Sequence, residues 1–161
     1  MFNFNPTQVS ANLEVFAKGD YEVILNEPKP YFQAGKPNAQ TGENYPDSEG
    51  LMWTLRIAEG EHKSKPIIFR PNFNNEFGPQ QAKSLLVAAN GFPAGQEGEQ
   101  AYNASHSTDD FSYSADPENV HIGQAWVDTK GKRVIVSLDV TMGKGDNAGK
   151  IYQQFKGFKA I

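Results

Sequence analysis

Lysine and aromatic side chains are interleaved near the carboxyl end of this 161-residue chain. Segment 151–159 carries three rings and two lysines, and the glycine-rich stretch before it, 142–150, holds Lys144 and Lys150. Ammonium groups bind phosphates, and exposed rings stack on nucleic-acid bases, each stack contributing about 1–3 kcal/mol. The pattern therefore predicts a site for a flexible polyanion with unpaired bases.

Charge is distributed unevenly along the chain, whose formal net charge is −4. Residues 129–161 hold seven basic and two acidic side chains, a net charge of +5, whereas residues 1–128 hold eight and seventeen, a net charge of −9. One cationic surface can thus form on a protein that is anionic overall. For any single lysine we favour the alternative of an ordinary solvated side chain, so the prediction depends on the cluster.

The predicted nucleic-acid interface combines rings for stacking with cations for phosphates. Tyr152 is preferred to Phe155, because residues three apart on a regular strand face opposite sides and a phenol tolerates a half-wet position. Trp53 alternates with apolar residues and is assigned to the core, whereas Trp126 has polar neighbours and fits either place. The ring candidates are Tyr31, Phe32, Phe73 and Tyr152, and the cation candidates are Lys36, Arg56, Arg70, Lys144, Lys150, Lys156 and Lys159.

The sequence favours binding over catalysis. Cysteine is absent, which excludes disulfides and thiolate zinc sites. The histidines, His62, His106 and His121, are far apart, and there is no Gly-x-Ser-x-Gly motif. The glycines around Lys144 and Lys150 lack the spacing of a phosphate-binding P-loop. We therefore expect no catalytic residue, no metal and no cofactor.

Alternating apolar residues predict short strands separated by polar turns. Pro28 and Pro30 are expected to end or bend the first strand, and residues 33–50 to form a long polar loop. Gly78-Pro79 is expected to open one short helix, which ends at Asn90-Gly91. The predicted strands are 20–26, 51–57, 65–70, 134–140 and 152–159, with 120–127 as a further candidate.

This order predicts a mainly β, single domain over residues 1–161. Three strands, a helix and two or three further strands are typical of a five-stranded Greek-key barrel of the OB type, with one short helix between the third and fourth strands. A β-sandwich is the alternative, because periodicity does not determine how a sheet closes. Residues 1–18 are expected to be a lead-in segment, and residues 94–119 a polar insertion without a core-facing period.

Several short motifs resemble a known family. They are the Phe-Asn-Pro start, the segment 18–23 that enters the first strand, the hairpin through Gly60, and the closing segment 152–159. Together they resemble small phage-encoded single-stranded DNA-binding proteins with an OB-fold, a group long catalogued as a phage domain of unknown function. The resemblance covers nearly the whole chain and implies sequence-independent binding of single-stranded DNA in phage replication or recombination.

The expected setting follows from these observations. The chain has neither a leader nor an apolar run long enough for a bilayer, so we expect no membrane association and a place in the cytoplasm of a bacterial host. Phage replication or recombination proteins are possible partners, but no acidic tail is present to recruit them. The alternative functions are a β-rich interaction or structural module of a phage assembly, and a binder of RNA or oligosaccharide on the same fold.

Overall fold

The protein is mainly β in its computed structural model, which describes residues 14–145 and 148–161. The helices of the described residues are α2 (Phe77–Ala89), α3 (Gln96–Ala104), α4 (Gln124–Val127) and the 3-10 helix η1 (Thr108–Phe111). The strands are β1 (Gly19–Leu25), β2 (Lys29–Gln33), β3 (Ser48–Ile57), β4 (Pro66–Phe69), β5 (Tyr113–Ser114), β6 (His121–Ile122), β7 (Arg133–Met142) and β8 (Ile151–Lys159).

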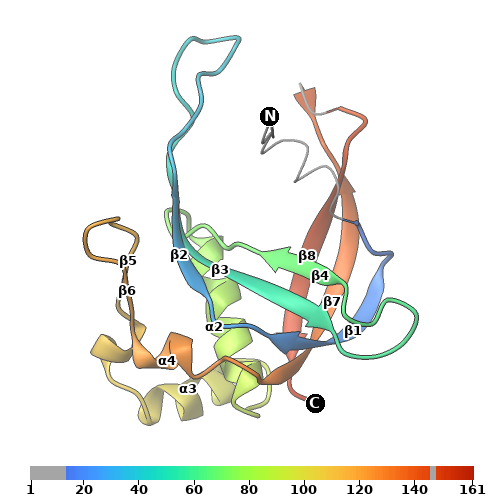
Figure 1. The fold of residues 1–161 in the computed structure, drawn as a ribbon, viewed down its shortest axis with the longest axis vertical. Helices are drawn as coiled ribbons and strands as arrows, with labels where there is room; N and C mark the ends of the chain where they lie inside the picture. Colours follow the sequence, from blue (N-terminus) through green and yellow to red (C-terminus); the bar gives the residue numbers. More distant parts are fainter. Residues whose placement is uncertain (1–13, 146–147) are drawn as a thin grey trace, which may run out of the picture.

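Six strands form one strongly curled antiparallel sheet (Figure 1). β3 pairs on one edge with β1 and β2 and on the other edge with β4. β1 also pairs with β7, and β7 pairs with β8, so β4 and β8 are the outermost strands of the curl. β5 and β6 form a separate small hairpin.

The hydrophobic core fills the inside of the curl. Trp53 is fully buried, as predicted, and its indole N–H donates to the Oγ1 of buried Thr129 at 3.1 Å. Phe69 at the end of β4 contacts Phe155 and Phe158 of β8, each at a ring-centroid distance of 4.9 Å. These rings join the two outermost strands by side-chain packing.

Helix α2 confirms the predicted helix and packs on β7 and β8. Asn75 lies just before the helix, and its side-chain oxygen accepts the N–H groups of Phe77 and Gly78 at 3.0 and 2.8 Å. The predicted stop is also confirmed, since Gly91 adopts a left-handed φ of +80°. The buried face of the helix covers one side of the sheet with Ala82, Leu85, Leu86, Val87 and Ala88.

The predicted first strand does not end at its prolines. After a bend at Pro28 the chain forms β2, which pairs with the first half of β3 from Lys29 opposite Met52 to Gln33 opposite Ser48. Pro30 is tolerated within β2, because β2 pairs with β3 alone and needs backbone donors only along that edge. The large sheet therefore has six strands, so the predicted count of five is not confirmed.

The prediction of a strand over 120–127 is wrong. Strand β6 covers only His121–Ile122, and Gln124–Val127 form the short helix α4. Both Ala125 and Trp126 are buried, which adjacent residues of a strand cannot achieve on one sheet face but a helical turn allows. Trp126 thus belongs to the core, where its ring lies 5.8 Å from that of Trp53.

The segment predicted as a polar insertion, 94–119, contains ordered secondary structure. It holds α3, η1 and β5, so the expectation of a single helix is also wrong. Tyr102 of α3 is fully buried and stacks on His106 at 4.1 Å, and burial raises the pKa of the Tyr102 phenol to about 12. One deeply buried ring anchors α3, which explains why no periodic apolar pattern marks it.

The predicted lead-in is described only from residue 14 onward, and residues 1–13 lie outside the described part. Phe16 is buried against the sheet. Its backbone N–H and C=O both bond to the side-chain amide of Gln153 in β8, at 2.7 and 3.0 Å. The end of the lead-in therefore packs on the curled sheet, as predicted.

Candidate nucleic-acid interface

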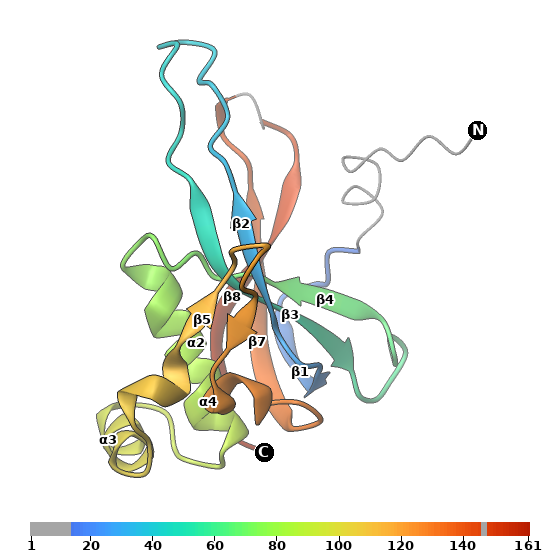
Figure 2. The ribbon, with the colours of Figure 1, turned by 60° about the vertical axis from the view of Figure 1, so that its left-hand side comes forward.

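Two hairpin arms project from the same end of the curled sheet, as Figures 1 and 2 both show. The β2–β3 arm comprises residues 31–50, and the β7–β8 arm comprises residues 139–154 apart from 146–147. Helix α3 and the C-terminus lie at the opposite end. Each predicted site residue can therefore be located relative to these two arms.

The tip of the β2–β3 arm, residues 34–47, is held by its own hydrogen bonds. The N–H of Tyr45 donates to the carbonyl of Lys36 at 2.8 Å, and the N–H of Gly35 donates to the carboxylate of Asp47 at 2.8 Å. A side chain at Gly35 would collide with the carbonyl oxygen of Tyr45, so glycine permits this close approach. The arm thus presents Lys36 and Tyr45 as exposed side chains on a defined backbone.

The two adjacent rings of β2 have different surroundings. Phe32 is 57% exposed. Tyr31 is half-buried, with the guanidinium of Arg70 at 5.2 Å from its ring centroid and its hydroxyl donating to the carbonyl of Pro71 at 3.0 Å. Burial raises the pKa of the Tyr31 phenol. Phe32 is therefore the ring of this pair that is open for stacking, while Tyr31 holds Arg70 at the base of the arm.

Phe73 is a packing residue in this structure. Its ring meets Tyr113 edge-on at 5.3 Å and lies 5.9 Å from Trp126. The approach depends on Gly50, where an added Cβ would come within 2.6 Å of the Pro71 carbonyl oxygen and 3.3 Å of the Phe73 ring. Phe73 is half-buried and joins the β2–β3 arm to the core.

The β7–β8 arm brings Lys144 and Lys150 together. The N–H of Gly143 donates to the carbonyl of Lys150 at 2.9 Å and closes the base of the turn. Both lysines are exposed, and neither forms an ion pair with another described residue. The predicted turn also includes residues 146–147, which lie outside the described part. Two exposed lysines at the same hairpin tip can each contact a phosphate of one strand.

The same arm exposes apolar side chains next to these lysines. Met142 lies opposite Ile151, and both are largely exposed, at 66% and 55%. Tyr152 lies opposite Thr141 and is 41% exposed. An apolar and aromatic surface beside cations suits a ligand that has both flat bases and phosphates.

An irregularity in β8 separates Lys156 from the arm. The β7 pairing steps from Ser137 opposite Gly157 to Leu138 opposite Phe155, so Lys156 is the extra residue of a β-bulge. The bulge lets Phe155 and Phe158 both contact the core, and Phe155 thus faces inward while Tyr152 is exposed. Lys156 lies beside α2, in a shallow groove of about 320 Å³ that Phe77 also lines.

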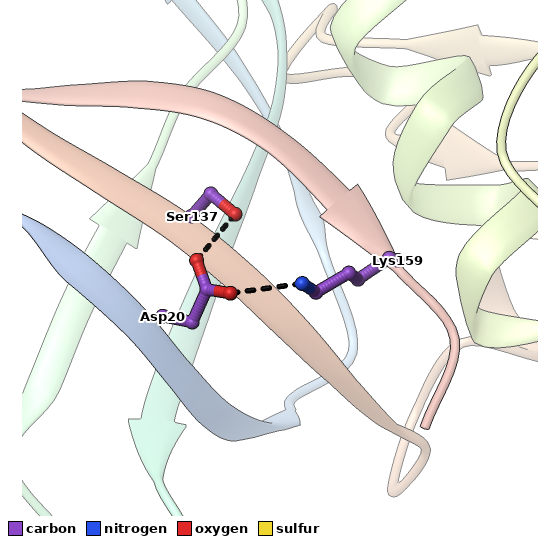
Figure 3. A network of polar contacts seen from close by, with 3 residues as sticks. All are labelled: Asp20, Ser137 and Lys159. Atoms are coloured by element: carbon purple, nitrogen blue, oxygen red, sulfur yellow. Dashed lines mark hydrogen bonds and ion pairs between the residues drawn. The ribbon is translucent and has the colours of Figure 1, made fainter.

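Arg56 and Lys159 form other contacts and belong to neither arm. Arg56 donates from Nη1 to the carbonyl of Ser64 at 3.1 Å. Lys159 lies 2.8 Å from the Asp20 carboxylate, which also accepts the hydroxyl of Ser137 at 2.7 Å (Figure 3). The hydrogen bond from Lys159 holds the Asp20 pKa below its ordinary value. This network joins β1, β7 and β8 near the middle of β7, where Asp20 lies opposite Ser137.

The structure thus divides the predicted site residues into three sets. The arms carry Phe32, Lys36, Lys144, Lys150 and Tyr152. The base of the β2–β3 arm holds Tyr31, Arg70 and Phe73, whereas Arg56, Lys156 and Lys159 lie apart from both.

One exposed ring was missed by the sequence analysis. Tyr45 on the β2–β3 arm is 54% exposed. An isolated aromatic residue within a long polar loop, followed by Pro46, is the signal that could have identified it. Such a ring has no core-facing partner in the sequence pattern, so it is either a functional side chain or an incidental one.

The structure places limits on other chemistry in the described residues. No helix among them is long and apolar enough to cross a membrane. No group of three or more His, Cys, Asp and Glu side chains in the same part of the chain could hold a metal ion. A comparison with protein-family models and with curated proteins gave no match.

Proposed function

We propose that this protein binds single-stranded DNA in a sequence-tolerant manner, across the end of the sheet from which the two arms project. The observation that carries the proposal is the joint presence of exposed rings and lysines on these arms. The β2–β3 arm offers Phe32 and Lys36, and the β7–β8 arm offers Tyr152, Lys144 and Lys150. Stacking tolerates every base, and phosphate contacts carry no sequence information.

The strand pairing supports an OB-type barrel as the finer fold. Counting β1 and β2 as one bent strand, the first strand pairs with the second, β3, and with the fourth, β7. β4, the third strand, pairs with the second strand, and β8, the fifth strand, pairs with the fourth. Helix α2 follows the third strand. The two arms then correspond to the loops that flank the ligand face of an OB-fold.

The charge distribution along the chain supports DNA binding at the same surface. The β7–β8 arm belongs to residues 129–161, whose net charge is +5. Such a segment favours association with a polyanion, while the anionic remainder opposes nonspecific aggregation. The protein would act by binding alone, without catalysis.

The cellular role that we propose follows from the sequence resemblance. It is protection of single-stranded DNA during phage replication or recombination, in the cytoplasm of a bacterial host. Replication or recombination proteins would be the partners.

A fluorescence titration tests the proposal, with oligo-dT, duplex DNA and RNA of equal length at two salt concentrations. We expect tight binding of oligo-dT, with a logarithmic salt slope of about −0.7 per phosphate contact on a single strand. Duplex DNA should bind much more weakly, because its bases cannot stack on the arm rings. Equal affinity for single-stranded and duplex DNA would contradict the proposal.

A protein-interaction module is the second candidate, and the exposed apolar side chains of the β7–β8 arm favour it. Val140, Met142 and Ile151 are all exposed, and such a surface can also pack against another protein. This candidate predicts no oligonucleotide binding at low salt and a stable oligomer in light scattering. The titration above and one scattering measurement therefore separate the two functions.

A further inference from the structure

An open pocket lies between the β2–β3 arm and the β5–β6 hairpin. Its volume is about 790 Å³, which falls within the roughly 300–1,000 Å³ typical of small-ligand sites. Phe32 and Glu49 line it from the arm, and Tyr113 and residues 114–117 line it from the hairpin. Figure 2 shows the β5–β6 hairpin in front of the sheet beside β2. The segment 94–119, which had no predicted role, thus supplies one wall.

Two rings of this pocket can accept a flat ligand. The Phe32 ring is mostly exposed, and no core contact restrains it. Tyr113 is held more firmly, because β5 pairs it with Ile122 and its ring contacts Phe73 at 5.3 Å. One exposed ring and one ring held by its neighbours are suited to stacking on a single base.

Two carboxylates also face this pocket. Glu49 lies close enough to the Tyr113 phenol that its charge adds to the effect of burial in raising the Tyr113 pKa. Asp116 is oriented by its own loop, since its Oδ1 accepts the N–H of Glu118 at 3.0 Å. Neither carboxylate forms an ion pair with a described residue.

The carboxylates determine which part of a nucleotide can enter. They repel phosphate, and an ionised carboxylate is an acceptor only, so it selects groups that donate hydrogen bonds. Cytosine, adenine and guanine each carry an exocyclic amino group, and acidic side chains accept from such groups. Thymine presents two carbonyl oxygens on either side of its N3–H, and these would face the carboxylates unfavourably.

We propose that this pocket binds one base with an exocyclic amino group and disfavours thymine. The inference rests on the proposed function and refines it: most of the bound strand is held without regard to sequence, and one position is read. Phe32 and Tyr113 stack on the base, and Glu49 and Asp116 accept its amino hydrogens.

A competition titration with the full chain tests the pocket. The competitors are oligo-dT and the same oligonucleotide with one central cytosine, adenine or guanine. Because a sequence-tolerant binder can shift along the strand, a single amino-bearing base can reach the pocket. We expect the register that places the amino-bearing base in the pocket to bind about fivefold tighter than a thymine register, the lower end of the range for a bidentate contact to a base. The whole strand should tighten by less, in proportion to the number of other registers.

Two near-isosteric variants locate the effect, and a third serves as a control. Glu49→Gln and Asp116→Asn should each remove most of the preference, chiefly by tightening the binding of oligo-dT, because an amide can also donate to thymine. Glu43→Gln removes the same charge from an exposed residue of the β2–β3 arm outside the pocket and should leave the preference unchanged.

The possible failures are distinguishable. If the wild type binds oligo-dT tightly and all substituted strands equally well, the pocket inference is overturned and the proposed function stands. The same holds if the preference survives in both Glu49→Gln and Asp116→Asn. If no oligonucleotide binds, both the pocket inference and the proposed function are overturned.

Discussion

The two halves of β7 carry the same alternating pattern but have different surroundings. Val134, Val136 and Leu138 are buried in the core, whereas Val140 and Met142, on the same strand face, are exposed. Period-2 alternation determines which residues share a face, but not whether another layer covers that face. A strand can therefore extend beyond the core without any change in its alternating sequence pattern.

The covering layer explains where the change occurs. In the core half, α2 packs on β7 and β8, and Phe69 of β4 meets Phe155 across the curl. The arm half extends beyond these elements, as Figures 1 and 2 show. Its apolar side chains and the nearby Lys144 and Lys150 therefore remain available to a ligand.

Truncation of one residue in each half gives the largest contrast in stability. Leu138 is 2% exposed and Met142 is 66% exposed. We expect Leu138→Ala to lower the free energy of unfolding by about 2–5 kcal/mol, because it removes buried methyl groups and leaves a cavity. Met142→Ala should change it by less than about 0.5 kcal/mol. Urea denaturation followed by circular dichroism measures both, and equal losses would show that the arm half is packed like the core.

Truncation of an exposed ring on an arm should weaken DNA binding and leave the stability nearly unchanged. Tyr152→Ala and Phe32→Ala are each expected to weaken oligo-dT binding by about 1–3 kcal/mol, the contribution of one stacked base, with the unfolding midpoint nearly unchanged. Phe77→Ala is the matched control, because Phe77 is exposed at the start of α2 and lies on neither arm. Fluorescence titration measures the affinities, and a loss in the control as large as in the arm variants would argue against stacking on the arms.

The smallest expected effect concerns Asp20 and Lys159, which join β1 to β8. The Asp20 pKa lies below its ordinary value of 3.8 in the folded protein, because it accepts hydrogen bonds from Lys159 and Ser137. A lowered carboxyl pKa stabilises the fold fully above the unfolded pKa, and this contribution is lost as the pH falls through the folded pKa. Lys159→Gln should therefore be slightly less stable than the wild type at pH 6, with a smaller difference below pH 3.8.

The same variant separates two roles for Lys159. Oligo-dT affinity at pH 7 should stay close to that of the wild type, because Asp20 already pairs with this ammonium. A loss of affinity comparable to that of an arm variant would restore Lys159 to the binding surface. Denaturation midpoints across the pH range, together with one titration, measure both properties.

Much of the fold could be predicted because it follows local rules. Alternation located β1, β3, β4, β7 and β8, and the proline and glycine signals located α2. The errors have tertiary causes. β2 forms because the first half of β3 provides an edge with which the chain can pair after the bend at Pro28. α4 forms because a helical turn allows the adjacent residues Ala125 and Trp126 to be buried together.

The candidate site was predictable only in part. Residue type and loop position indicated Lys36, Lys144, Lys150, Phe32 and Tyr152, which lie on the arms. The place of Lys159 is decided by Asp20, a residue far away in the sequence, and that of Phe73 by the space at Gly50. Such long-range partners leave no periodic signal.

Charge reversal at the tip of the β7–β8 arm tests the central claim most directly. The double variant Lys144→Glu/Lys150→Glu is compared with Lys63→Glu/Lys130→Glu, which makes the same change in net charge at exposed turns outside the arms. Oligo-dT is titrated at several salt concentrations.

The account predicts an affinity loss of about tenfold or more for the arm variant. It also predicts a salt slope smaller in magnitude by about 1.4, for two lost phosphate contacts on a single strand. The control should lose far less affinity and keep its slope. Equal affinities and slopes for the two variants would contradict binding by the arms.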